Sequence, residues 1–283
     1  MYPVTICALV VMGNHLHMLL VVEDPESVPR FIEFFKRESA HAINRLLGRS
    51  KHTVWCNGYD SPVILDANKV MQRLVYFYTN PQRARLVSVI EDYPHYTTWS
   101  NFISGETSTQ LVPVFPRHAI PRLSKGDGSA SSEESERVYQ QLLHESVGGA
   151  ELEIVPFAWL NVLSSGGSQH SVILSVTNRV RAIEQSLLER KGVEVEGADA
   201  LINQDIRKPH QPRMRGKRMI CLGSDPRKRS KYIEWFLRES RMAHRNILEW
   251  MGRRAALIIP PGFFAPGGRI LANILPCAIF QPT

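Results

Sequence analysis

The chain has 283 residues, of which 43% are hydrophobic, and its formal net charge is +7. This composition supports at least one sizeable core and argues against a disordered protein, and the length favours two domains over one. A positive net charge favours a polyanionic partner, either nucleic acid or an acidic membrane surface. The surplus is local, because residues 207–254 hold 15 Lys and Arg against 4 Asp and Glu.

The cysteine spacing and the apolar ends of the chain indicate in which cellular compartment the protein is expected. The four cysteines are far apart and form no CxxC pair, which argues against a zinc module or a disulfide framework. The apolar first twenty residues lack a basic lead, and the apolar stretch at 256–280 is broken by prolines and glycines. We therefore expect a reduced, cytoplasmic protein with neither a signal peptide nor a membrane span.

The chain opens with two predicted strands and a helix. Residues 4–11 and 15–22 are β-branched or apolar runs separated by Met-Gly-Asn, a pattern typical of a hairpin. Residues 27–47 then place apolar side chains at helical spacing, with Pro29 in the first turn and Gly48 as the stop.

A second strand and helix pair follows after a turn-rich stretch. We predict a short strand at 62–65 and a helix over 67–79, which ends before the Asn80-Pro81 dipeptide. Residues 105–137 are rich in Pro, Gly and Ser and read as a flexible linker. Beyond it, helices are expected near 178–191 and 226–251.

Two histidines in the second strand suggest a metal site. Side chains two apart on a strand point to the same face, so His15 and His17 would present two imidazoles side by side. Imidazole binds Mn, Zn and Fe well and Mg less readily, so the pair alone leaves the metal undecided. On its own an HxH pattern is more often structural than functional.

One face of the helix at 67–79 adds a nucleophile. At about 100° per residue, Lys69, Arg73, Tyr76 and Asn80 share one sector, whereas Tyr78 lies on the opposite, apolar side. We predict that Tyr78 is a core residue and that Tyr76 is the nucleophile. A tyrosine attacks a phosphodiester only when its proton is lost, which a metal and a nearby Arg73 would favour. The carbonyl oxygen of Asn80 could complete the metal shell.

Three blocks of sequence resemble a known family of enzymes. Residues 12–17 (MGNHLH) look like the histidine-hydrophobic-histidine motif of single-tyrosine HUH transposases. Residues 76–87 (YFYTNPQRARLV) are similar to the Y-x-x-x-NP-x-x-A-x-x-V block of the REP-associated tyrosine transposases. Residues 93–99 (YPHYTTW) resemble the W/Y-P-x-S-S run that follows that helix in the family. The resemblance covers residues 1–104.

This resemblance implies a fold and a reaction. The fold is α+β, a ferredoxin-like HUH catalytic domain, and the reaction cuts and rejoins single-stranded or hairpin DNA through a 5′-phosphotyrosine intermediate. By position, Tyr76 takes the role of nucleophile, and Asn80 joins His15 and His17 in holding a divalent metal ion, Mg or Mn. The family has one strand and one helix before the segment where this chain begins, so we expect an N-terminally truncated domain with an open place in its sheet.

The basic C-terminal third is a second candidate for DNA contact. On the helix near 226–251, Arg238, Arg241 and Arg245 recur on one side and would form a cationic stripe. The alternative is an ordinary solvated helix, in which Glu234 pairs with Arg238. The neighbouring basic cluster favours DNA, because phosphate neutralisation requires many cations together.

The sequence thus predicts a transposase-like domain over 1–104, a linker over 105–137 and a basic, mainly helical domain over 138–283. The expected DNA-binding residues are Lys69, Arg73 and the three arginines of the stripe. The expected partners are DNA and, as an option, a second copy of the chain, in a nucleoid-associated, cytoplasmic setting without membrane contact. Two alternatives remain open: a catalytically inactive DNA-binding protein derived from such an enzyme, and an unrelated metal-binding regulator.

Overall fold

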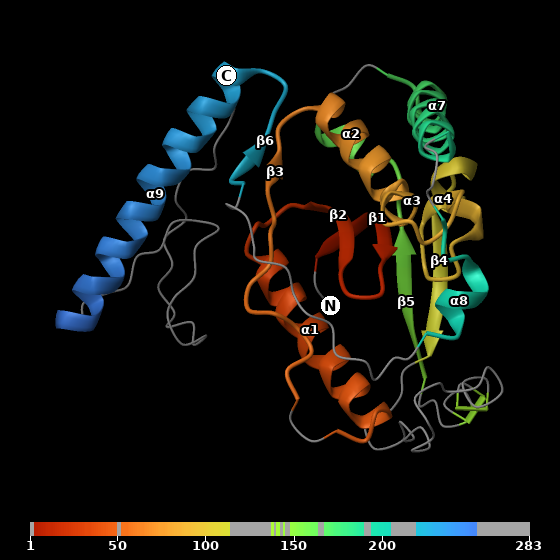
Figure 1. Cartoon of the computed structure of the whole chain (residues 1–283). Coiled ribbons are helices and arrows are strands. Elements are labelled where there is room, and N and C mark those ends of the chain that lie inside the picture. Colours follow the sequence, from red (N-terminus) through yellow and green to blue (C-terminus); the bar gives the residue numbers. More distant parts are fainter. Residues whose placement is uncertain are drawn as a thin grey trace.

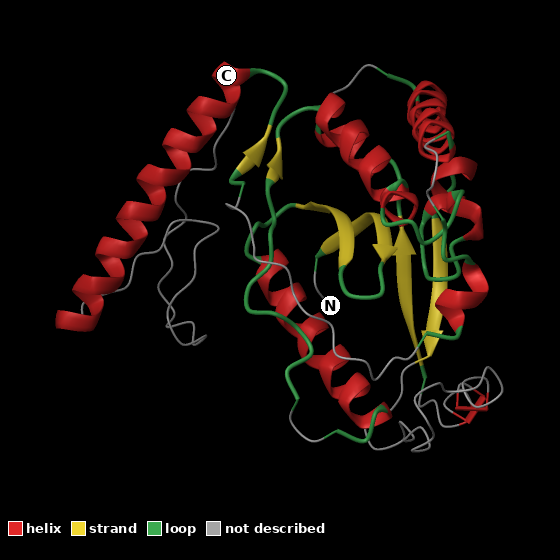
Figure 2. Cartoon of the chain, viewed as in Figure 1, coloured by secondary structure: helices red, strands yellow, loops and turns green. Residues whose placement is uncertain are grey.

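The computed structural model describes residues 3–49, 52–113, 137–138, 140–141, 144, 148–163, 167–189, 194–204 and 219–253. Helices and a mixed sheet of four strands make up this part of the chain, and its C-terminal region is helical. The α+β class expected from the sequence is confirmed. Figure 2 shows the strands gathered in the middle of the view and the helices around them.

The elements follow in this order: β1 (Val4–Val11), β2 (Leu16–Val22), α1 (Ser27–Leu46), β3 (Val63–Ile64), α2 (Ala67–Tyr78), α3 (Asn80–Arg83), the 3-10 helix η1 (Ile90–Asp92), α4 (Trp99–Ser104), β4 (Ser108–Pro113), β5 (Gly149–Ile154), α6 (Ala158–Val162), α7 (Gln169–Leu188), α8 (Ala198–Ile202), β6 (Cys221–Leu222) and α9 (Pro226–Arg253). The hairpin, the first two helices and the short strand between them lie where the sequence predicts them.

The main sheet has the strand order β2-β1-β5-β4. The β1–β2 hairpin is antiparallel, and its register places Val10 opposite His17 and Val11 opposite Leu16. β4 and β5 form a second antiparallel pair, and β5 joins the first pair by a parallel contact between Ile6 and Ile154. The hairpin therefore carries the histidine strand at one edge of the sheet (Figure 1).

Two later segments occupy the edge of β1 that faces away from β2. Near the end of β1, the backbone of Val11 donates to Tyr96 and that of Thr98 donates to Leu9. Near its start, Val155 donates to Ile6 over 2.9 Å. Because a buried strand edge with unpaired backbone groups is costly, these bonds explain how β1 lies inside the sheet. The open place expected beside this hairpin is thus filled by residues from further along the chain.

Helices α2, α4 and α7 pack with β1 in one apolar core. Leu74, Tyr78 and Phe102 are fully buried, and Val176 and Val180 of α7 lie in the same cluster. Figure 1 shows α2 and α7 near one another above the sheet in this view. Tyr78 is 0% exposed, which confirms its predicted place in the core. The core draws on residues from both sides of the stretch expected to be a linker.

Two segments differ from the sequence-based expectation. Residues 108–113 fall inside the predicted linker, yet they form β4 and pair along their length with β5. The stretch of low apolar content that suggested a linker is residues 124–136, which lie outside the described part of the chain. The helix expected near 178–191 begins at Gln169, where the side chain of Ser168 accepts a hydrogen bond from Ser171.

A small parallel sheet connects the basic C-terminal helix to α2. β3 pairs with β6, and α9 packs beside β6 (Figure 1). Asp66, which follows β3, caps α2 by accepting from the backbone of Lys69 over 2.9 Å. The same carboxylate accepts hydrogen bonds from the backbone and hydroxyl of Ser224, just before α9. One aspartate therefore ties the start of α2 to the start of α9.

Candidate functional site

Three polar side chains meet where the hairpin faces the junction of α2 and α3. Nε2 of His15 and Nε2 of His17 lie 3.1 Å apart. The side-chain amide of Asn80 approaches both, with Nδ2 at 2.6 Å from His17 and 3.1 Å from His15. We call these three residues the imidazole–amide trio. The structure thus brings together the three residues that the sequence analysis proposed as metal ligands.

Local backbone features put the trio in place. His15 lies in the hairpin turn just before β2, and its carbonyl accepts a hydrogen bond from the backbone of Met12. His17 is the second residue of β2, so both imidazoles leave the same side of the strand. Asn80 is the first residue of α3, directly after Thr79 ends α2. The Asn-Pro dipeptide therefore stops one helix and aims the amide at the histidines.

Hydrogen bonding and burial determine where the two imidazoles carry protons. Oδ1 of Asn14 contacts Nδ1 of His15, and an amide oxygen only accepts, so Nδ1 of His15 carries a proton. The pKa of His17 falls to about 4, because burial disfavours the cation and the charges of His15 and Arg73 add to this. His17 is consequently neutral at pH 7, the form in which imidazole binds metals.

Tyr76 lies against the trio from α2. Its ring packs edge-on against His17, with 5.3 Å between ring centroids and 74° between planes. The guanidinium carbon of Arg73 lies 5.7 Å from the centroid of the Tyr76 ring. Tyr76 is 37% exposed, whereas Tyr78 two residues later is buried and approaches the hydroxyl of Thr98 at 3.2 Å. Of these two tyrosines, only Tyr76 is accessible to a macromolecular substrate.

Phe77 contacts the trio, and the sequence analysis missed this residue. Its ring stacks on the imidazole of His17 with 5.0 Å between centroids and 15° between planes. Phe77 is 8% exposed, so His17 packs on a buried apolar ring. The run of three aromatic residues at 76–78 offered a signal, since the residue between the exposed and the core tyrosine must face sideways, toward the hairpin.

The remaining predicted site residues lie in two places. Lys69 is one turn before Arg73 on α2, and its Nζ donates to Gln72 over 2.8 Å. Arg238, Arg241 and Arg245 are all exposed on α9, which places them on one accessible side of that helix. Arg238 pairs with Glu239 at 3.1 Å. The structure does not bring these three arginines into the trio.

The donor set of the trio fits an intermediate divalent cation. It provides two imidazole nitrogens and one amide, and a half-turn of the Asn80 amide would present Oδ1 instead of Nδ2 to the histidines. Two nitrogens and one oxygen suit Mn²⁺ better than Mg²⁺, which prefers oxygen ligands. Among the described residues, no group of three His, Cys, Asp or Glu side chains has the spacing of a metal site. A metal ion held by His15 and His17 would therefore need the amide of Asn80 as its third protein ligand.

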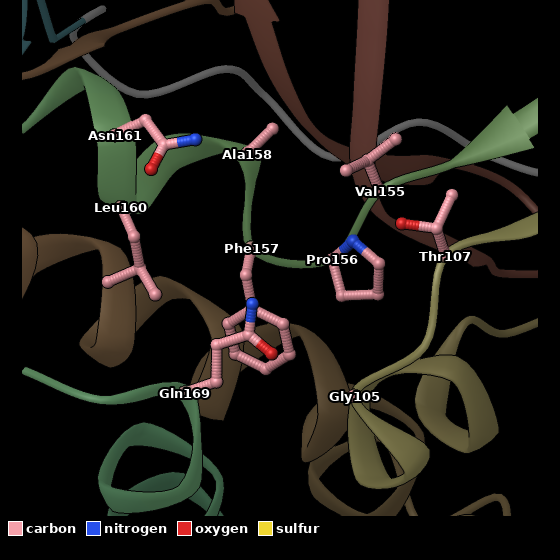
Figure 3. Close-up of a pocket in the computed structure, with 9 residues that line it drawn as sticks. All are labelled: Gly105, Thr107, Val155, Pro156, Phe157, Ala158, Leu160, Asn161 and Gln169. Atoms are coloured by element: carbon pink, nitrogen blue, oxygen red, sulfur yellow. The ribbon is translucent and has the colours of Figure 1, made fainter.

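Other features of the described chain lie away from the trio. A pocket of about 140 Å³ opens between the ends of α4 and β5 and the start of α7, and residues such as Thr107, Phe157 and Gln169 line it (Figure 3). None of the predicted site residues lines this pocket. Every helix in the described part of the chain is too short or too polar to cross a lipid bilayer.

Comparison with known proteins gives one match. Residues 1–74 match the model of a protein family described as "Transposase IS200 like". The chain matches no curated protein and no solved structure. The matched segment contains the hairpin, both histidines and the first two turns of α2, and it ends two residues before Tyr76. This N-terminal segment is thus similar to IS200-like transposases, and the match supports a transposase-like function in DNA processing.

Proposed function

We propose that the protein is a single-tyrosine DNA strand transferase of the REP-associated kind, in which Tyr76 attacks the backbone of single-stranded or hairpin DNA. The observation that supports this most directly is the packing of an accessible Tyr76 against the imidazole–amide trio, with Arg73 beside it. The family match over residues 1–74 supports the same class of reaction.

The reaction exchanges one phosphodiester for another. The phenolic oxygen of Tyr76 forms a bond to phosphorus, and the bond from phosphorus to the 3′-oxygen breaks. The phenolic proton is released, and the departing 3′-oxygen takes up a proton, so the step is balanced. The products are a 5′-phosphotyrosine and a free 3′-hydroxyl. The reverse attack by a 3′-hydroxyl rejoins the DNA and restores the tyrosine.

The side chains around Tyr76 have separate roles in this step. Arg73 lies close enough to favour the phenolate and to contact the phosphate that is attacked. Phe77 and Asn14 hold the two imidazoles in orientation. His15, His17 and Asn80 would hold a divalent ion, Mg²⁺ or Mn²⁺, which when bound would withdraw charge from the scissile phosphate. Lys69 and the arginine stripe on α9 would contact the DNA backbone further away.

Formation of a covalent adduct tests this proposal. The full chain is incubated with Mn²⁺ and a 3′-labelled, randomised single-stranded DNA pool that contains hairpins, because the fragment on the 3′ side of the cut stays attached to Tyr76, and adducts are separated under denaturing conditions. We expect an adduct with the unchanged chain and none with Tyr76→Phe. Tyr96→Phe is the matched control, because Tyr96 is also 37% exposed but lies outside the trio. His17→Ala should also abolish the adduct.

Each alternative function predicts a different result. Salt-sensitive DNA binding without any adduct would support the catalytically inactive DNA-binding protein and contradict the enzyme. Retention of metal without either DNA binding or a role for Tyr76 would support a metal-binding regulator. A second copy of the chain as partner is a further part of the proposal, which sedimentation of the free and DNA-bound chain would test.

A further inference from the structure

A second pocket lies between α3, which directly follows the helix that carries Tyr76, and the end of α7. Its cavity volume is about 140 Å³. Gln82 and Arg83 of α3 line one wall together with Arg85, Val87 and Ser88, and the other wall consists of Leu187, Leu188 and Val195. We call it the α3–α7 pocket. A cavity of about 150 Å³ accepts a single benzene ring, so this volume suits one planar ring.

Backbone and side-chain bonds hold the two walls together. Glu196 and Gly197 donate backbone hydrogen bonds to the carbonyls of Arg85 and Leu86, at 3.0 and 2.9 Å. Glu184 of α7, which is 3% exposed, accepts from the side chain of Gln82 at 2.7 Å and from the backbone of Ile90. These bonds join segments that are about 100 residues apart in sequence. The two walls of the pocket are therefore fixed relative to one another.

The chemistry of the lining is mixed in a way that suits a nucleotide. Gln82 and Ser88 are the uncharged polar residues of the lining. Leu187, Leu188 and Val195 offer apolar surface for the ring.

Two cations stand at the opening of the pocket. Arg83 and Arg85 are both exposed, and neither forms an ion pair with a carboxylate in the described part of the chain. Arg83 donates Nε to the hydroxyl of Thr79, which fixes its direction. Guanidinium groups bind phosphate oxygens through paired N–H donors. Apolar side chains, two uncharged polar residues and two arginines without an ion pair in the described part of the chain together match a base attached to its phosphate.

We propose that the α3–α7 pocket binds one unpaired nucleotide of the DNA substrate, with its base inside the pocket and its phosphate on Arg83 and Arg85. This inference rests on the proposed function, since α3 follows directly after the helix that carries Tyr76. The bound nucleotide would not adjoin the phosphodiester that Tyr76 attacks. By holding one nucleotide at a fixed place, the pocket would select the position along the strand at which the protein cuts.

The test compares two labelled strands of equal length by fluorescence anisotropy, without added metal. One strand carries randomised bases, and the other is abasic throughout and therefore offers phosphates alone. The full chain should bind the base-bearing strand about tenfold more tightly. Ser88→Phe and Val195→Phe fill the pocket from opposite walls, and each should lower the affinity for that strand to the abasic level while leaving the abasic affinity unchanged.

The arginine contact is tested with the same strands. Arg85→Gly should weaken binding of both strands and reduce the salt dependence by about 0.7 in the log–log slope, the value for one phosphate on a single strand. Arg30→Gln, at an exposed arginine of α1, is the matched control and should change neither quantity. Urea unfolding of every variant shows whether a loss of binding comes from unfolding.

The outcomes separate this inference from the proposed function. Equal binding of the two strands by the unchanged chain, or a preference that survives in both filled variants, overturns the pocket. If the Tyr76-dependent adduct still forms in that case, only the pocket is wrong. A preference that both filled variants remove supports the pocket, and if no adduct forms, it is the nuclease chemistry that fails.

Discussion

Arg85 has a backbone conformation that few side chains tolerate. Its φ is 63°, and it is the only non-glycine residue with positive φ in the described part of the chain. For residues other than glycine, this left-handed conformation costs roughly 1–2 kcal/mol. Such strain persists where the surroundings enforce it, often at functional sites. Here the carbonyl of Arg85 is held by the backbone of Glu196, and its side chain lies at the opening of the α3–α7 pocket.

Arg85→Gly should therefore increase the stability of the fold while it weakens DNA binding. We expect the free energy of unfolding to rise by about 1 kcal/mol, because glycine adopts positive φ without a steric penalty. Urea unfolding measures this change. Arg83→Gly is the matched control with the opposite sign, since Arg83 is helical and glycine there should cost about 1 kcal/mol. A loss of stability in Arg85→Gly would contradict the strain argument.

Some residue-level features followed from spacing alone, and others did not. Helical periodicity separated the exposed Tyr76 from the buried Tyr78, and the alternation of a strand placed His15 and His17 on one side. The stacking of Phe77 on His17 depends on how the hairpin meets α2. That contact joins segments about sixty residues apart, for which sequence periodicity carries no information.

At the scale of elements, Asp66 connects the start of α2 to the start of α9 through hydrogen bonds. It caps α2 through Lys69 and also accepts two hydrogen bonds from Ser224. Burial alone would raise the pKa of Asp66, but the hydrogen bonds from Ser224 and Lys69 outweigh this and lower it. A lowered pKa means that the carboxylate stabilises the fold above its ordinary pKa near 4, and that this contribution is lost as the pH falls through the lowered value.

Asp66→Ala should destabilise the fold by about 1–2 kcal/mol at pH 7, the usual cost of removing a helix N-cap. The difference from the unchanged chain should shrink as the pH is lowered below 4, because the carboxyl of the unchanged chain becomes protonated there. Urea unfolding at several pH values measures this dependence. Asp92→Ala, at an exposed aspartate of η1, is the control and should stay within about 0.5 kcal/mol. A difference that does not vary with pH would contradict the role of the charge.

The sequence predicted the helices more completely than the strands. Helices α1 and α2 both have apolar periodicity, and Asp66 caps α2, so their bounds could be read locally. β4 and β5 carry weaker local signals, and a stretch outside the described residues separates them along the chain. They become strands by pairing with each other and, in β5, by joining β1. Pairing between distant segments is a tertiary effect that overrides local composition.

At the scale of the whole molecule, the position of β5 decides how the candidate site is supported. β1 lies between β2, which carries His17, and β5, which enters beside Ile6. The far side of the same core is closed by α7, whose Val176 and Val180 are fully buried. Residues on both sides of the stretch 114–136 are thus needed to hold the hairpin against α2. The candidate site and the segment after residue 136 therefore share one core.

Substitution of Ile154 tests this dependence. Ile154 is 0% exposed where β5 meets β1, and truncation to alanine should lower the free energy of unfolding by about 2–5 kcal/mol through lost burial and a residual cavity. Glu151→Ala, on the same strand but exposed, is the matched control and should stay within about 0.5 kcal/mol. Because β1 positions the imidazole–amide trio, we also expect Ile154→Ala to weaken the Tyr76 adduct at temperatures where the chain remains folded. Equal stability of the two variants would show that the hairpin and α2 hold together without β5.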